Sequence, residues 1–276
     1  YGKNTTGGAI HIVSRAPSRE PEARGEVALG DRRFMQLRGS VSGALSATTA
    51  ARLSAQLTRR DGLIRNVRDG ERLNALDNYA LRGQLLFEPR DDLKLRFIAD
   101  VANLDAACCT QSYLRFGQSR RSAARQFPAL AAGLGYAPPS LDVYDRLSDI
   151  DADLRIDTQD GGLALLADWR LAAGTLTSVT AWRYWDWDVA NDRDYTGIAI
   201  QSVQRIPSRQ DQYSQELRFA SAGDGPWRYV AGLYFFGQEI AGKPTSIYGR
   251  EAAYWLLNPA NFTVALPRNL LDGYGQ

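Results

Sequence analysis

The chain is poor in the residues that build metal centres. Its 276 residues include a single histidine, His11, and two cysteines, Cys108 and Cys109, which are adjacent. A zinc site takes four ligands from spaced cysteines and histidines, and no such spacing occurs here. A lone histidine without clustered ligands is more often a packed or hydrogen-bonded side chain. We therefore expect no metal site.

The chain also has no long apolar run and no excess of one charge. No window approaches the roughly 18 uninterrupted apolar residues of a membrane helix, although a β-barrel crosses a membrane without such a run. Lysine and arginine total 33 and aspartate and glutamate 31, a formal net charge of +2. Because the basic residues are scattered among acidic ones, nucleic acid is excluded as an electrostatically bound partner.

The state of Cys108 and Cys109 stays open at this level. Adjacent cysteines form a vicinal disulfide in an oxidising compartment. Each can instead pair with a cysteine outside this sequence, and two loop thiols without mechanistic importance are an equal alternative.

Most of the chain repeats apolar residues with a period of two, which indicates β-strands. In one run, Met35, Leu37 and Val41 alternate with polar residues such as Gln36. Many runs have about the 9–11 residues that a tilted strand needs to cross a bilayer. The pattern predicts nine strands, at residues 24–30, 34–43, 50–59, 78–88, 92–101, 161–171, 175–188, 211–220 and 227–238.

The two faces of these strands differ in chemistry. One face carries apolar side chains, and we expect four of them to face lipid: Leu37, Leu53, Leu85 and Phe97. The other face carries Gln36, Gln84 and charged residues, which fit a hydrated or plugged lumen better than the core of a β-sandwich. We therefore predict an all-β fold, a partial antiparallel transmembrane β-barrel.

The connections alternate in length, apart from a brief hairpin around Asp31–Arg33. The short turns are Ala44–Thr49, Pro89–Asp91, Ala172–Gly174 and Ser221–Pro226. The long loops are Arg60–Asp77, Ala102–Asp160, Val189–Gln210 and the stretch from Glu239 onward. Short turns at one end and long loops at the other are typical of outer-membrane barrels.

Two local features are less clear. Aromatic residues crowd the strand ends, as at Trp182–Trp187 and Trp227–Tyr229, which favours interfacial girdles, with ordinary β-propensity as the alternative. The faces of strand 175–188 are ambiguous. Within the longest loop, Ser119–Ala137 predicts a short helix before Pro138-Pro139.

The first seventeen residues carry the most informative motif, Tyr1-Gly2-Lys3-Asn4-Thr5-Thr6-Gly7-Gly8-Ala9-Ile10-His11-Ile12-Val13-Ser14-Arg15-Ala16-Pro17. The Gly-Gly pair permits a turn, Ala9–Val13 predicts a strand, and Pro17 ends it. A phosphate-binding loop needs a glycine five residues before Gly2-Lys3 and Ser or Thr directly after Lys3. The sequence has neither, because it starts at Tyr1 and Asn4 follows Lys3.

This stretch resembles the end of the plug domain in TonB-dependent outer-membrane receptors of the siderophore-receptor type, which usually carry Asn in place of His11. The segment Thr175–Arg183 resembles a barrel strand of this family, and Gln212–Phe219 with Gly225–Trp227 resembles the next hairpin. The resemblance implies that residues 1–16 end a plug domain and that residues 17–276 form the first part of a barrel. We expect the chain to be a fragment, because it begins within the motif and shows no signal peptide.

What the resemblance implies is active import of a scarce nutrient, most often a ferric siderophore, across the bacterial outer membrane. A periplasmic TonB energy-coupling protein would be the partner, acting through a preceding segment, and membrane lipid and lipopolysaccharide would surround the multi-pass barrel. No covalent chemistry is implied, so we expect no enzyme, no catalytic residues and no cofactor. The alternatives are a passive porin-like or adhesin barrel and, more remotely, a secreted glycan hydrolase with paired carboxylates.

Ligand capture is expected in the long loops. Anionic ferric siderophores with flat surfaces suit arginine beside aromatic rings, through charge and stacking. The loop Ala102–Asp160 concentrates such residues, and further aromatic residues rim the next opening. The candidate ligand-facing residues are Tyr113, Arg115, Arg120, Arg121, Arg125, Tyr144, Trp185, Trp187 and Tyr195, with Phe116 beside them.

Overall fold

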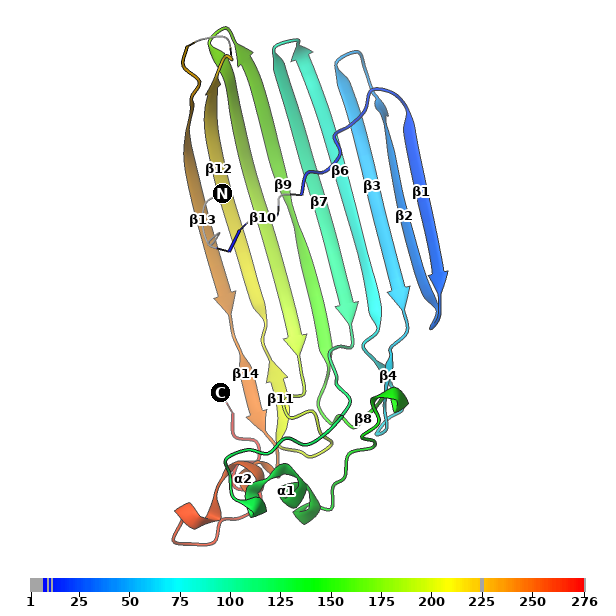
Figure 1. Ribbon diagram of the computed structural model, residues 1–276, viewed down its shortest axis with the longest axis vertical. Helices are drawn as coiled ribbons and strands as arrows, with labels where there is room; N and C mark the ends of the chain where they lie inside the picture. Colours follow the sequence, from blue (N-terminus) through cyan, green and yellow to red (C-terminus); the bar gives the residue numbers. More distant parts are fainter. Residues whose placement is uncertain (1–6, 9, 11, 224–225, 276) are drawn as a thin grey trace.

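One large antiparallel sheet dominates the computed structural model (Figure 1), which describes residues 7–8, 10, 12–223 and 226–275. Within these residues the sheet has 11 strands. They are β1 Glu22–Gly30, β2 Phe34–Ala44, β3 Thr49–Arg60, β6 Leu76–Arg90, β7 Leu93–Ala106, β9 Arg155–Leu171, β10 Gly174–Ala190, β11 Gln201–Arg205, β12 Ser208–Ser221, β13 Val230–Gly242 and β14 Thr245–Tyr248.

The eleven strands make nine passes along the sheet. β12 pairs with β10 at Ser208, and β11 pairs with the same strand at Arg205, so the two occupy one position in the sheet. Pro207 separates them, and Pro244 separates β13 from β14 in the same way. Proline has no N–H for the ladder and ends regular pairing. The nine predicted strands are therefore confirmed.

The predicted faces are confirmed as well. Residues that pair directly across an antiparallel ladder share a face, and Leu85 pairs with both Ala51 and Phe97. Leu37, Leu53 and Phe97 lie on this same face, each with 38–49% of its surface exposed. Gln84 lies on the opposite face and is only 6% exposed.

The inner face is identified by the segment that crosses it before β1 (Figure 1). Gln84 Nε2 donates a hydrogen bond to the carbonyl of Arg15 at 2.9 Å, and Arg52 Nε donates to that of Ala16 at 3.1 Å. The backbone N–H of Ser18 donates to Ser42 Oγ at 2.8 Å. These contacts bury polar side chains of β2, β3 and β6 beneath the segment.

The strand predicted over Ala9–Val13 is not found. Ala9 and His11 lie outside the described residues, and Ile10, Ile12 and Val13 adopt no strand, with exposed fractions of 93%, 87% and 68%. An extended segment becomes a strand only when a neighbour pairs its backbone groups. No described strand runs beside these residues.

The longest strands exceed the roughly 9–11 residues that a tilted strand needs to cross a bilayer. β9 and β10 have 17 residues each, or about 56 Å at 3.3 Å per residue. Every short turn lies at one end of the sheet and every long loop at the other, except for the β1–β2 hairpin (Figure 1). The longest loop is residues 107–154, shorter than predicted, because the polar ends of β7 and β9 continue to pair with each other.

Small helices lie among the long loops. The predicted helix is confirmed for only seven residues, as α1 Phe127–Gly133, preceded by the 3-10 turn η1 Ala123–Arg125. Pro128 favours the first turn of α1, and Leu134 caps the helix after its last residue, Gly133. A second helix, α2 Ala252–Leu256, follows β14. Among the described residues, no helix has the length and apolarity to span a membrane.

The two faces predict opposite responses to an added charge. Leu53→Arg should lower the free energy of unfolding of the full-length protein in lipid vesicles by roughly 2–4 kcal/mol, because the exposed apolar face would meet lipid there. Gln36→Arg on the inner face should lose the 3.0 Å hydrogen bond to Thr58, about 1 kcal/mol. Refolding titrations measure both, and equal losses would contradict the assignment of faces.

Candidate functional site

The long loops form one assembly at the end of the sheet. A small second sheet contains β4 Ile64–Asn66 and β5 Arg72–Leu73 from the β3–β6 loop and β8 Leu147–Ser148 from the β7–β9 loop. β4 pairs in parallel with β8, with Asn66 opposite Ser148. Two loops that are distant in sequence therefore share backbone pairing.

Two asparagines of the β3–β6 loop hold the β7–β9 loop. Asn66 is 3% exposed, and its amide accepts from the N–H of Ile150 and donates to the carbonyl of Ile150, both at 3.1 Å. Asn74 makes the same pair of bonds to Thr110, at 2.9 and 3.0 Å. A carboxamide carries a donor and an acceptor side by side, so each asparagine substitutes for a strand neighbour.

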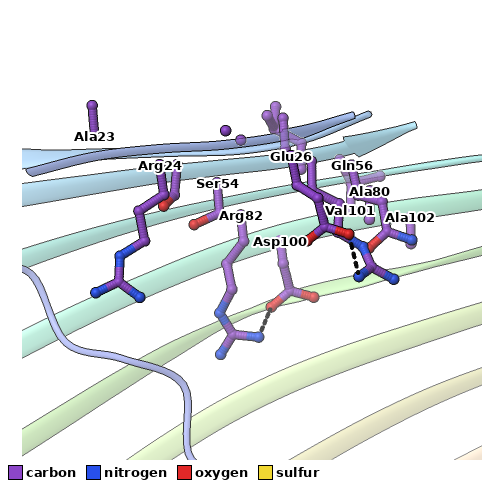
Figure 2. A pocket seen from close by; sticks show the side chains of 16 residues that line it. Ala23, Arg24, Glu26, Ser54, Gln56, Ala80, Arg82, Asp100, Val101 and Ala102 are labelled. Atoms are coloured by element: carbon purple, nitrogen blue, oxygen red, sulfur yellow. Dashed lines mark hydrogen bonds and ion pairs between the residues drawn. The ribbon is translucent and has the colours of Figure 1, made fainter. Parts of the chain in front are cut away.

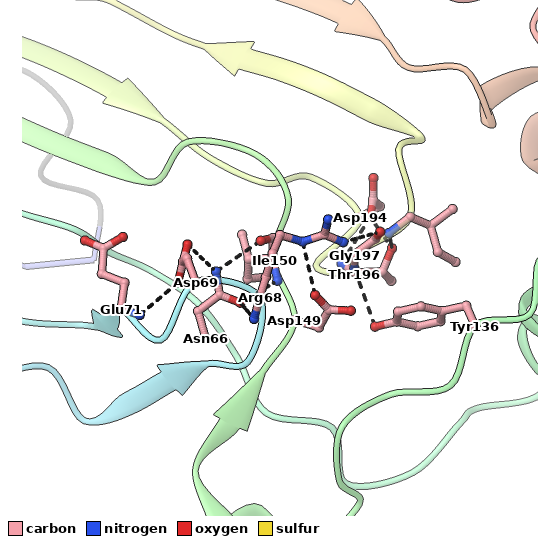
Figure 3. A network of polar contacts seen from close by, with 11 residues as sticks. Asn66, Arg68, Asp69, Glu71, Tyr136, Asp149, Ile150, Asp194, Thr196 and Gly197 are labelled. Atoms are coloured by element: carbon pink, nitrogen blue, oxygen red, sulfur yellow. Dashed lines mark hydrogen bonds and ion pairs between the residues drawn. The ribbon is translucent and has the colours of Figure 1, made fainter.

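A third loop, residues 191–200 after β10, joins this assembly (Figure 3). Arg68 reaches from the β3–β6 loop to the carbonyl of Gly197 at 2.6 Å and to Asp149 at 3.3 Å. The Tyr113 hydroxyl donates to the carbonyl of Tyr195 at 3.1 Å. Three loops are thus connected by hydrogen bonds from side chains.

A small apolar core lies beneath these contacts. Leu73, Ile150 and Leu154 are each at most 7% exposed and pack together, with Tyr195 against them. The polar contacts described above add to this core in holding the loops together. Desolvated hydrogen bonds of this kind are costly to lose.

The third loop also buries carboxylates. Burial raises the pKa of Asp194 to about 7, and the neighbouring carboxylate of Asp192 adds to the shift. Burial also raises the pKa of Asp192, to about 6. Asp192 Oδ1 accepts from the N–H groups of Asp194 and Tyr195, whereas its Oδ2 has no partner within the described residues. Across that same part of the chain, no three His, Cys, Asp or Glu side chains are arranged to hold a metal ion.

The two cysteines form a disulfide with each other. Of the three states left open by the sequence, the structure therefore has the vicinal disulfide. The backbone N–H of Asn74 donates to the carbonyl of Ala107 at 2.7 Å, and its side chain binds Thr110. Asn74 thus holds the chain on both sides of the Cys108–Cys109 pair.

An outer layer consists of α1, α2 and their neighbours. Arg125 donates to the carbonyls of Tyr254 and Trp255, at 2.8 and 2.7 Å, near the end of α2. Phe127 stacks on Phe116 with ring centroids 4.6 Å apart and meets the edge of Trp255. Arg125 therefore completes hydrogen bonds that a short helix leaves unmade.

The structure divides the predicted ligand-facing residues of the long loops into two groups. Tyr113, Tyr195 and Arg125 are at least partly buried and hold the loops together, through the contacts given above. The others in the β7–β9 loop are exposed: Arg115, Arg120, Arg121 and Tyr144. Among the loop candidates, this second group has the exposed side chains.

The two remaining candidates lie on the inner wall. Trp185 and Trp187 stack with ring centroids 5.4 Å apart, and their cross-strand partners, such as Asp160, belong to the inner face. Trp182 and Tyr184 alternate with them and point outward, beside Leu163. The ambiguity of this strand is thereby resolved. An interfacial girdle fits only the outward pair.

The inner wall also has a polar hollow of about 850 Å³ that was not predicted (Figure 2). Arg38 pairs with Glu26 at 3.5 Å, and Arg82 pairs with Asp100 at 3.7 Å. Arg24 projects from the same face. The signal in the sequence was the set of charged residues at inward positions of successive strands. The sequence did not show which of them would meet.

Comparisons with known proteins identify the fold. No family model matches the chain. The ferric yersiniabactin uptake receptor FyuA from Yersinia pestis aligns over 87% of this chain at 17% identity, with a TM-score of 0.68. The siderophore receptor PiuA from Acinetobacter baumannii aligns over 88% of this chain at 11% identity, with a TM-score of 0.65. The ferric-catecholate import receptor Fiu from K12 E. coli aligns over 96% of this chain at 14% identity, with a TM-score of 0.61.

The chain has the fold of TonB-dependent siderophore receptors. The aligned region is 34–36% of each receptor chain, so the chain spans about a third of their length. With most of this chain aligned in each case, the nine-pass sheet as a whole has the siderophore-receptor fold. The predicted fold class is confirmed, and the open sheet corresponds to part of a barrel.

The buried carboxylates predict loops that loosen as pH rises. Because folding raises the pKa of Asp194 from its ordinary value of 3.8 to about 7, the folded loop binds more protons than the opened loop. Its stability therefore falls between about pH 4 and 7. Hydrogen exchange across residues 191–201, corrected for intrinsic pH dependence, should show this change. Asp194→Asn should flatten it, and Asp145→Asn, at an exposed position, should not.

Proposed function

We propose that this chain is part of an outer-membrane receptor that imports a ferric siderophore. The observation that carries the proposal is the siderophore-receptor fold, in which the outward face is apolar and the long loops gather at one end. An exposed apolar face of this extent favours contact with lipid. The loop end would then face the outside of the cell, where a scarce ligand arrives.

The exposed arginines suggest which ligands the receptor takes. Arg115, Arg120 and Arg121 lie in one loop, and no acidic partner within hydrogen-bond or ion-pair distance is found for them in the described part of the chain. Guanidinium groups bind carboxylates in a bidentate manner and stack on flat rings. An anionic iron complex with planar chelating groups fits this chemistry. Trp185 and Trp187 would offer a stacking surface deeper along the wall.

The remaining parts of the proposal follow from the resemblance to the family. Residues 1–16 would be the end of a plug domain and residues 17–276 part of the barrel. A periplasmic TonB protein would supply energy through a preceding segment, and lipid and lipopolysaccharide would contact the outer face. The contacts of Arg15 and Ala16 with the inner wall support a lumen on that side.

The proposed orientation predicts unequal labelling of two exposed positions. In intact cells, a membrane-impermeant maleimide should react with Arg193→Cys in the third loop and not with Ala47→Cys in the β2–β3 turn. The native cysteines form a disulfide and should not react. After lysis both positions should be labelled. Equal labelling of the two sites before lysis would contradict the proposed orientation.

The proposed ligand class predicts a loss of affinity when the exposed arginines are neutralised. The triple variant Arg115→Gln, Arg120→Gln, Arg121→Gln should bind the preferred member of a panel of catecholate, hydroxamate and carboxylate iron complexes roughly 10–100-fold more weakly, as expected for lost charge-assisted contacts. The matched control neutralises Arg33, Arg72 and Arg193, three exposed arginines of other connections at the loop end.

Uptake of the same complex separates a receptor from a passive pore. Whole cells that carry the full-length protein should accumulate radioactive iron, and a protonophore should stop accumulation while surface binding continues. Uptake that survives the protonophore would favour the porin-like alternative. Absence of binding by every complex in the panel would contradict the siderophore assignment.

A further inference from the structure

Within the described residues, Arg68 is the one side chain whose polar contacts join three loops. It begins in the β3–β6 loop, where its own N–H donates to Asn66 Oδ1 at 3.4 Å. Its guanidinium meets Asp149 of the β7–β9 loop at 3.3 Å and the carbonyl of Gly197 in the third loop at 2.6 Å (Figure 3). The planar guanidinium presents several donors in fixed directions, so one group binds both partners at once.

The peptide of Gly197 is held from both sides. Its carbonyl accepts from Arg68, and its N–H donates to the hydroxyl of Tyr136 at 3.5 Å. A Cβ at this position would collide with the carboxylate of Asp149 and the guanidinium of Arg68. A side chain at position 197 would therefore displace Arg68 or Asp149 and disturb the bridge.

The charges around Arg68 make the bridge difficult to replace. Asp149 is only 17% exposed, and Arg68 also lies close enough to Asp151 to oppose the rise that burial causes in the pKa of that carboxyl. Two carboxylates therefore lie near one guanidinium. Removal of that positive charge leaves the carboxylate of Asp149 largely buried without its partner. This costs more free energy than the loss of an ion pair on the surface.

We propose that Arg68 is a positioning residue that couples the three long loops, so that the ligand-capture surface is held and displaced as a single body. The inference rests on the proposed function, because it assigns a purpose to the alignment of these loops. Arg68 itself need not touch the ligand. It fixes the loop that bears Arg115, Arg120 and Arg121 relative to the loop that bears Tyr195, and so lowers the entropic cost of binding.

Spin-label distances between two loops test the coupling without any ligand. Labels at Arg72→Cys and Arg193→Cys, both exposed positions, report on the β3–β6 loop and the third loop in the full-length protein in vesicles. Arg68→Gln should broaden the distance distribution, and Arg68→Lys should broaden it too, since an ammonium lacks the planar fork. An unchanged distribution in both variants would overturn the proposal.

Arg33→Gln is the matched control. This exposed arginine pairs with Asp61 at 2.7 Å, at the base of the same β3–β6 loop, but it does not reach the third loop. It should leave the distances unchanged. Broadening equal to that of Arg68→Gln would show that any lost ion pair loosens the loops, and this would overturn a specific role for Arg68.

Ligand binding then separates failure of the proposal from failure of the proposed function. If the parent binds a ferric siderophore, Arg68→Gln should weaken binding about tenfold while the thermal unfolding of the barrel stays unchanged. Unaltered affinity together with broadened distances would overturn the link to capture. If the parent binds no complex in the panel while the distances still broaden, the proposed function fails and the loop coupling stands.

A double-mutant cycle gives an independent readout. Arg68→Gln and Asp149→Asn should each broaden the distance distribution, and the double variant should broaden it little beyond Arg68→Gln alone, because Arg68→Gln already removes the contact with Asp149. Additive effects would show that the two residues act separately and would contradict the bridge.

Discussion

The antiparallel ladder is the constraint on which the remaining structure depends. Because side chains alternate between two faces along every strand, pairing of β2 with β3 and of each later strand with its neighbour forces all apolar positions onto one surface. A shift of β3 by one residue against β2 would bring Leu53 to the inner wall and Arg52 to the outside. The contacts of Arg52 with Glu22 and with the carbonyl of Ala16 oppose that shift.

The loop end is organised by a different principle. Beside the small apolar core around Ile150, polar side chains act as substitutes for strand neighbours. Asn66 and Asn74 each bind both backbone groups of one distant residue, and Arg68 joins two further partners. Such bonds have direction, which apolar contacts lack, and they set the relative positions of loops that share little buried surface.

The sequence predicted the sheet well and the loop assembly poorly, for a physical reason. A two-residue period is a local signal, so strands such as Gly174–Ala190 and their faces can be recognised without knowing their neighbours. Asn66 and Ile150, which bind each other, lie 84 residues apart in the sequence, and no local pattern indicates that they meet. The strand expected at Ala9–Val13 shows the complementary limit, since an apolar pattern becomes a strand only beside a partner, and none of the described strands pairs with Ile10, Ile12 or Val13. Of the candidate site, the exposed arginines were identifiable, whereas the structural roles of Arg125 and Tyr113 depended on distant carbonyls.

The segment Arg15–Pro21 has a mechanical consequence. Its bonds to Ser42, Arg52 and Gln84 fasten it to three consecutive strands, and Arg19 adds an ion pair with Glu88 at 2.6 Å. A tension applied to the residues before Arg15 would load these bonds in sequence and spread over β2, β3 and β6. The hydrogen bonds between those strands number many more than the bonds that hold the segment. The segment would therefore detach from the wall at a lower force than the one that separates the strands. The sheet would stay intact when the segment is pulled away.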